Sequence, residues 1–353
     1  MTRRLVISAC VVLAFAATLF ILFMARLESR RTMVVPILMY HEIGKIADSP
    51  WCVPTETFRA QISALRNQGY RTILPSDIVA HRKWGKPLPR RPVILTFDDG
   101  YLSALKSAEP ILKENGFRGI IYLITAQIAE TPAERRQYEG KDCLVWPEAQ
   151  AMQERGVFIF GGHSHDHANL AGIPNPAAQV TECKKQLRLH GIDKPYSFCY
   201  PHGQCNKNTE QAAREAGFQT AVVCEDAVAA IGPTNDLFAL PRVSVMGGRH
   251  DFRLVSADLD AAKRALTCRI LHSGIPLEIS AGLGKKNNAI CVWLCPREIR
   301  EGEFNLLFSL PENTSGDALD RLEIWDKHRL FQLATFVNEG LPEEPRRPDS
   351  KRE

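Results

Sequence analysis

Three of the ten histidines in this sequence fall within five residues, in the stretch GGHSHDHANL (161–170). Asp166 lies among them, so His163, His165 and His167 come with a carboxylate nearby. Imidazole and carboxylate groups are common ligands of divalent metal ions. The stretch therefore raises the possibility of a metal site, and the rest of the chain must decide which residues bind.

Other polar residues directly follow apolar runs. His41 ends VVPILMYH, Asp98 and Asp99 follow PVILTF, His202 lies in CYPHG, and Arg242 lies in LPRVSV. Two adjacent carboxylates repel each other unless a cation lies between them or one is protonated. Capping the next helix would require only one of them. The aspartate pair is therefore predicted to be functional.

The elements that must position these residues alternate along the chain. Strand-like apolar runs cover 34–40, 92–97, 118–124, 157–161, 196–200, 219–223 and 240–245. Helical spacing covers 57–70, 101–116, 146–156, 175–191 and 208–218. Such βα units with continuous apolar strands predict an α/β fold with a buried parallel sheet, here a distorted (β/α)7-type barrel. Catalytic side chains in a barrel project from the C-terminal strand ends, so the polar residues should gather at one rim.

Two further regions flank this barrel, which is predicted over 34–265. The segment 5–25 has 21 residues without a charge, enough for a transmembrane helix across a core of about 30 Å. It lacks a clear small-x-small cleavage site, which favours an uncleaved membrane anchor, with its linker, over 1–33. Short strand-like runs separated by turn signals predict a small antiparallel β domain over 266–338.

Composition narrows the remaining choices. The tail 339–353 is rich in proline and charge, which predicts disorder, and the polar insert 129–143 predicts a surface loop. A net charge of +4 is too small to indicate a nucleic-acid partner. Cys10 lies in the apolar segment, so an odd number of cysteines remains and at least one is free or pairs between chains.

Three motifs carry a resemblance to a known family. TFDDGY (96–101), HSHDHANL (163–170) and FCYPHG (198–203) resemble the first three motifs of the polysaccharide deacetylase family, the NodB-homology domain. The opening VPILMYHEI (35–43) resembles the subgroup that acts on exported polysaccharides. The pattern H-x-H-x-D-H of β-lactamase-type zinc hydrolases is one spacer longer than the string found here.

The resemblance implies a role for each motif residue. Asp99, His163 and His167 would bind a divalent metal ion, which we expect to be zinc, while His165 falls on a variable position. His163 and His167 would then share one face of a helical turn. Asp98 would be the general base and a metal-bound water the nucleophile. In the PHG turn, Tyr200 and the backbone N–H of His202 would contact the substrate or the oxyanion.

The chain also departs from the family pattern. Many members have an arginine in the third motif to orient the base, whereas this chain has Cys199 there. Arg242 is a candidate substitute, and a surface salt bridge is the alternative for it. No late motif supplies the general acid. His41 is the first candidate for that role, expected near the metal on the side away from Asp98, and His272 is the second. The alternative for His41 is a hydrogen bond to a loop or to the substrate.

The predicted function is removal of N-acetyl groups from an extracytoplasmic amino-sugar polysaccharide by a membrane-anchored hydrolase. A catalytically inactive carbohydrate-binding protein is an alternative, as is an O-acetyl esterase, because amide and ester hydrolysis can use the same site. The expected partners are the polysaccharide, the membrane through the N-terminal helix, and a glycan-synthesis or export complex, with no nucleic acid.

Overall fold

A computed structural model describes residues 32–44, 49–192, 194 and 196–247, the isolated residues Thr18 and Leu27, and the backbone of seven strands between 252 and 336. The chain divides into two compact units, Met1–Val245 and Met246–Glu353. The predicted membrane segment, 5–25, lies outside the described residues apart from Thr18. None of the helices that are described is long and apolar enough to cross a bilayer.

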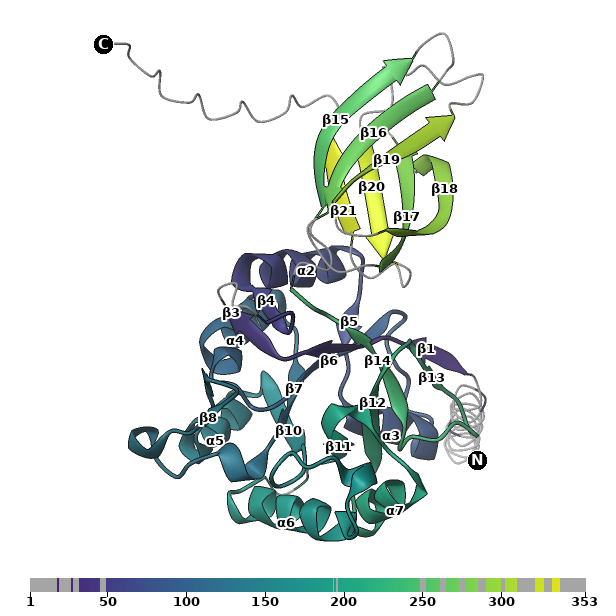
Figure 1. The fold of residues 1–353 in the computed structure, drawn as a ribbon. Helices are drawn as coiled ribbons and strands as arrows, with labels where there is room; N and C mark the ends of the chain where they lie inside the picture. The colour runs from purple at the N-terminus through teal and green to yellow at the C-terminus, as the bar shows by residue number, and fades with distance from the viewer. Residues whose placement is uncertain are drawn as a thin grey trace, which may run out of the picture. The chain divides into compact units, whose positions relative to one another are not determined.

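The first unit is built around a closed parallel barrel (Figure 1). In ring order its strands are β2 (Ile37–Tyr40), β14 (Leu240–Ser244), β12 (Thr220–Asp226), β11 (Ser197–Cys199), β10 (Phe158–Gly162), β7 (Gly119–Leu123) and β6 (Pro92–Phe97). Pairing of β6 with β2 closes the ring, and β5 (Arg71–Thr72) pairs with the outer edge of β6. The predicted seven-stranded α/β barrel is confirmed.

Burial explains why the strands read as apolar runs. Every residue of β2, β6 and β7 is buried, because one face lines the barrel interior and the other is covered by helices. The helices are α2 (Thr55–Asn67), α3 (Pro75–Trp84), α4 (Glu109–Asn115), α5 (Trp146–Arg155), α6 (Pro176–Leu189) and α7 (Lys207–Glu215). They lie around the ring of strands in Figure 1.

Local sequence sets the helix ends. The Asp77 carboxylate accepts from the Leu74 N–H at the start of α3, and the Asn175 side chain accepts from the Ala178 N–H at the start of α6. Gly85 and Gly156 end α3 and α5 in the left-handed conformation that a residue with a Cβ adopts at a cost. Helix α3 was not predicted.

Proline accounts for two differences from the predicted elements. The strand expected over 34–40 divides at Pro36, because proline has no N–H to donate to a ladder. β1 (Met33–Val35) pairs antiparallel with β13 (Ala229–Ile231), and only β2 enters the barrel. The helix expected over 101–116 starts with the π-helical turn η1 (Ala104–Ala108), directly ahead of Pro110 in α4.

In the second unit the structure describes antiparallel strands. They are β15 (Phe252–Asp260), β16 (Ala265–His272), β17 (Leu277–Gly284), β18 (Ile290–Ile299), β19 (Gly302–Ser309), β20 (Arg321–Asp326) and β21 (Gln332–Phe336). One sheet has the order β15-β16-β19 and the other β18-β17-β20-β21. The predicted domain boundary at 265/266 falls at the start of β16, whose partner β15 lies before it.

Candidate metal centre and catalytic rim

The two aspartates leave β6 at the barrel rim. The Asp98 N–H donates to the Tyr40 carbonyl (2.9 Å), which extends the pairing of β6 with β2 by one residue. Asp99 and Gly100 then take positive φ angles of 71° and 83° and turn the chain away from the strand. Both carboxylates are buried, with 2% and 5% of each residue exposed, so each needs a charged partner nearby.

The histidine stretch follows β10 as an irregular loop, so the predicted helical turn is wrong. Ser164 (φ 60°) and His167 (φ 67°) are left-handed, which a right-handed helical turn excludes. The His167 N–H donates to the Ser164 hydroxyl (2.9 Å) and closes the loop on itself. The loop still brings the ring of His167 against that of His163, with centroids 4.8 Å apart.

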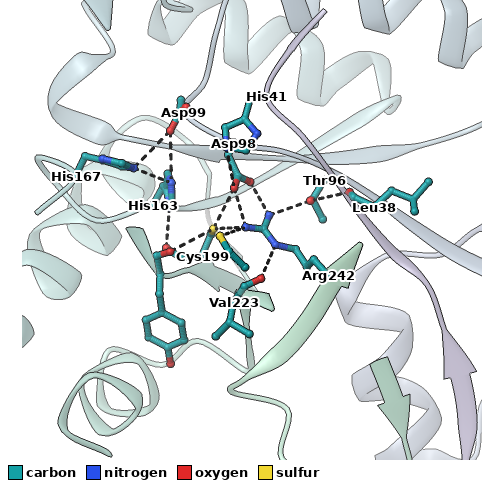
Figure 2. Close-up of polar contacts among 12 residues, drawn as sticks. Leu38, His41, Thr96, Asp98, Asp99, His163, His167, Cys199, Val223 and Arg242 are labelled. Atoms are coloured by element: carbon teal, nitrogen blue, oxygen red, sulfur yellow. Dashed lines mark hydrogen bonds and ion pairs between the residues drawn. The ribbon is translucent and has the colours of Figure 1, made fainter. Parts of the chain in front are cut away.

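Three ligand atoms converge between these motifs (Figure 2). Oδ1 of Asp99 lies 3.5 Å from Nε2 of His163 and 3.6 Å from Nε2 of His167, and the two Nε2 atoms are 3.2 Å apart. Ligands held at about 2.0–2.2 Å from one ion lie roughly 3–3.5 Å from each other. One carboxylate oxygen and two imidazole nitrogens at these separations fit a divalent cation, and Asp99, His163 and His167 form such a candidate group.

Hydrogen bonds orient His163 for this role. Its Nδ1–H donates to the Cys199 carbonyl (2.8 Å), which leaves Nε2 directed at Asp99. Burial opposes a charge on His163, but the hydrogen bond with Asp99 and the charges of Asp98 and Asp99 raise the pKa of this imidazole. A cation bound at Nε2 of His163 would take the place of the proton that this nitrogen otherwise binds.

The neighbouring polar residues of the loop point elsewhere. Nδ1 of His165 bonds the Thr125 hydroxyl (3.1 Å), and no metal-ligand group among the described residues includes His165. Asp166 accepts from the Ala168 N–H (3.0 Å) and from the Gln179 side chain (2.8 Å). Asp166 therefore caps the turn.

Arg242 reaches Asp98 from the far end of the sequence. Its NH1 and NH2 groups donate to Oδ1 and Oδ2 of Asp98, both at 2.8 Å. The guanidinium is fully buried, and its other donors meet the Val223 carbonyl, the Thr96 hydroxyl and the sulfur of Cys199. A surface salt bridge is excluded, and the guanidinium contacts the Cys199 sulfur at 3.2 Å.

This pair fixes the charge of Asp98. Burial alone would raise the pKa of Asp98, but the charge and hydrogen bonds of Arg242 outweigh it and hold that pKa well below its usual range. Burial and the charge of His163 lower the pKa of His167 to about 3. Around neutral pH Asp98 is ionised and His167 neutral, as a general base and a metal ligand require.

His41 lies beside Asp98, and the expectation that it would lie on the far side of the metal is wrong. Its Nε2 is 3.9 Å from Oδ2 of Asp98, and its ring packs on Trp51 with centroids 4.5 Å apart. Tyr40 pairs with Phe97 in neighbouring parallel strands, so the residues that follow them, His41 and Asp98, emerge side by side. Burial lowers the pKa of His41.

Two residues of the FCYPHG motif, Tyr200 and His202, lie in different environments. Tyr200 is buried in the core, and its N–H donates to the Val222 carbonyl (3.2 Å), so its predicted contact with the substrate is wrong. His202 lies exposed in the turn with φ 57°, and its ring centroid is 4.6 Å from that of His167. Its oxyanion role stays a prediction. His272 lies in β16, where only the backbone is described.

Comparison with known proteins decides the family of this site. The family model described as polysaccharide deacetylase matches residues 85–221, which carry Asp98, Asp99, His163, His167 and the PHG turn. The chain carries a polysaccharide deacetylase domain. The predicted family and class of enzyme are confirmed.

Relatives of this deacetylase domain are distant. The protein YxkH of Bacillus subtilis (strain 168) is 29% identical over 229 residues, 64% of this chain and 76% of that protein. The poly-beta-1,6-N-acetyl-D-glucosamine N-deacetylase of Escherichia coli (strain K12) is 20% identical over 81% of this chain, which spans only 47% of that enzyme. The Streptococcus pyogenes deacetylase PplD, solved in complex with acetate, superposes with a TM-score of 0.53 at 22% identity, covering 61% of this chain and 94% of PplD.

Two contributors to the site were missed by sequence reasoning. The Thr96 hydroxyl donates to the Leu38 carbonyl (2.9 Å) and accepts from Arg242. It therefore links the guanidinium to the neighbouring strand β2 by hydrogen bonds. Tyr138, whose hydroxyl lies 2.7 Å from Nδ1 of His167, comes from the insert predicted to be a surface loop. Thr96 is the first residue of the TFDDGY motif, but nothing in that motif indicated a bond to Arg242, and Tyr138 had no sequence signal.

Proposed function

We propose that this protein is a metal-dependent N-deacetylase that hydrolyses acetamide groups of an amino-sugar polysaccharide. The observation that carries the proposal is the convergence of Asp99, His163 and His167 beside the buried Asp98–Arg242 pair. A divalent cation at these three ligands would polarise the acetamide carbonyl and increase the acidity of a water beside it. Zinc suits two imidazoles and one carboxylate.

Asp98 then accepts the proton of the attacking water. Its pairing with Arg242 makes it a weaker base than a free carboxylate, but the same pairing keeps it ionised and fixes its orientation while it is buried. A cation at the three ligands would offset the loss of basicity, because it would increase the acidity of the water.

The departing amine must take up a proton. His41 is the candidate donor because its Nε2 faces Asp98 across 3.9 Å, close enough for a small rearrangement to pass the proton along. Since burial lowers its pKa, His41 is neutral before the reaction and gains the proton during it. The backbone N–H of His202 would assist at the oxyanion.

The substrate class follows from the relatives named as poly-beta-1,6-N-acetyl-D-glucosamine N-deacetylases. Purified protein should release acetate from partially N-acetylated glucosamine oligomers in a zinc- or cobalt-dependent manner. Release only from O-acetylated xylan would instead establish an esterase. No release from either, with the metal bound, would leave the carbohydrate-binding alternative.

The apolar segment 5–25 is proposed to anchor the domain outside the cytoplasm, where exported polysaccharide is found. Cell fractionation should place the full chain with the membranes, and external protease should degrade the barrel in spheroplasts. Recovery of the full chain in the soluble cytoplasmic fraction would contradict both the anchor and the proposed substrate class.

A further inference from the structure

A β-hairpin inserted after β7 contacts His167, one of the candidate metal ligands. It consists of β8 (Gln137–Tyr138) and β9 (Lys141–Asp142), joined by Glu139 and Gly140. These two turn residues have φ angles of 49° and 74°, the left-handed pair typical of a type I′ turn. Tyr138 therefore lies at the end of a tight, geometrically defined hairpin.

Hydrogen bonds tie this hairpin to the segment that carries Asp99. The Leu102 N–H donates to the Asp142 carbonyl (2.8 Å), and the Leu144 N–H donates to the Gly100 carbonyl (2.8 Å). At the other end, Arg135 makes two hydrogen bonds to the Glu148 carboxylate at 2.9 and 2.7 Å. The hairpin is thus fixed on both sides, and Tyr138 keeps a set position relative to the metal ligands.

The Tyr138 hydroxyl lies 2.7 Å from Nδ1 of His167, while the tyrosine ring packs edge-on against the imidazole with centroids 5.2 Å apart. A histidine that binds a metal through Nε2 carries its proton on Nδ1 and needs an acceptor there. For His163 the acceptor is the Cys199 carbonyl. For His167 the acceptor in position is the Tyr138 oxygen.

The two acceptors differ in what they allow. A carbonyl only accepts, so His163 is held in one tautomer. A hydroxyl both donates and accepts, so the Tyr138 hydroxyl can bond Nδ1 of His167 in either tautomer.

We propose that Tyr138 is a positioning residue of the metal centre, which holds the His167 ring with Nε2 directed at the cation through the hydrogen bond to Nδ1. The inference rests on the metal site of the proposed function. It assigns the insert a part in metal affinity, whereas a surface loop would have none.

The test compares Tyr138→Phe, which keeps the ring and removes the hydroxyl, with Tyr70→Phe, which makes the same change at a tyrosine packed under Arg91. After chelation and dialysis, calorimetry with Zn²⁺ should give a dissociation constant about 10–100-fold higher for Tyr138→Phe. The visible absorption of the Co²⁺ form should change in the same variant. The melting temperature of metal-free Tyr138→Phe should match that of the metal-free wild type.

The outcomes separate the two proposals. If wild-type protein binds neither Zn²⁺ nor Co²⁺, the metal-dependent function itself is wrong. If wild type binds and Tyr138→Phe binds within twofold of it with an unchanged Co²⁺ spectrum, only the role of Tyr138 is overturned. A fall in affinity accompanied by an equal loss of metal-free stability would also overturn it, because the hydroxyl would then act on the fold.

Discussion

The guanidinium of Arg242 donates a hydrogen bond of 2.8 Å to each carboxylate oxygen of Asp98, although the two residues lie 144 positions apart in the sequence. Neither side chain has another ionic partner as close among the described residues. Each charge is buried, so each depends on the other for its stability in the folded protein.

Removing the Arg242 guanidinium while Asp98 stays in place should therefore destabilise the protein strongly. Arg242→Met should lower the free energy of unfolding by about 3–5 kcal/mol, because it leaves a buried carboxylate without its partner. Adding Asp98→Asn in the same chain should restore part of the loss. Urea unfolding of the two single variants and the double variant measures the coupling, and strictly additive losses would mean that the pair is not coupled.

The two adjacent aspartates should differ in function. Asp98→Asn should keep the metal and lose about 10²–10⁴-fold in kcat, the usual contribution of a general base. Asp99→Ala should weaken metal binding itself, since its Oδ1 faces both imidazoles. Metal analysis of dialysed protein and acetate release distinguish the two effects. Loss of metal from the Asp98 variant alone would reverse the assignment.

The three clustered histidines should separate in the same way. His163→Ala and His167→Ala should lose the metal, whereas His165→Ala should retain it, because His165 bonds Thr125. Elemental analysis after gel filtration gives the metal content directly. Chelation should abolish wild-type activity, and added Zn²⁺ should restore it; full activity in protein shown to be metal-free would exclude the mechanism.

The ion pair between Arg135 and Glu148, which anchors the hairpin, should make the free energy of unfolding depend on pH. Burial alone would raise the pKa of Glu148, but the hydrogen bonds from Arg135 outweigh it and lower that pKa. The stabilisation is complete above the unfolded-state pKa of about 4.3 and is lost as the pH falls through the lower folded-state value. Glu148→Gln should cost about 1–2 kcal/mol at pH 7 and progressively less below pH 4. A cost that does not change with pH would show that the charge is irrelevant.

Sequence reasoning was most successful where strand burial and motif residues coincide. The apolar run 92–97 predicts a buried strand, and the barrel rule then places Asp98 and Asp99 at the same rim as His163 and Arg242. What it could not give is backbone geometry. The i, i+4 spacing of His163 and His167 pointed to a helical turn, yet two left-handed residues bring the rings together instead.

The errors have a common physical origin in side-chain direction. Tyr200 belongs to the PHG motif but points into the core, because its backbone still follows the pairing of β11 with β12. Tyr138 lies in a polar insert without hydrophobic periodicity, so no pattern indicated that its ring would face His167. Among the described residues, all five non-glycine residues with positive φ belong to the metal loops, the PHG turn or this hairpin.

The closure of the barrel links catalysis to the order in which the chain can fold. β2 pairs with β6 early in the sequence, but its other edge waits for β14, the last strand of the ring. Arg242 lies on β14, so the strand that completes the barrel also delivers the counter-charge of Asp98. Pairings this distant in sequence slow folding, since a long loop must close before they contribute. A nascent chain interrupted before β14 would carry every predicted metal ligand and still lack the guanidinium that holds Asp98.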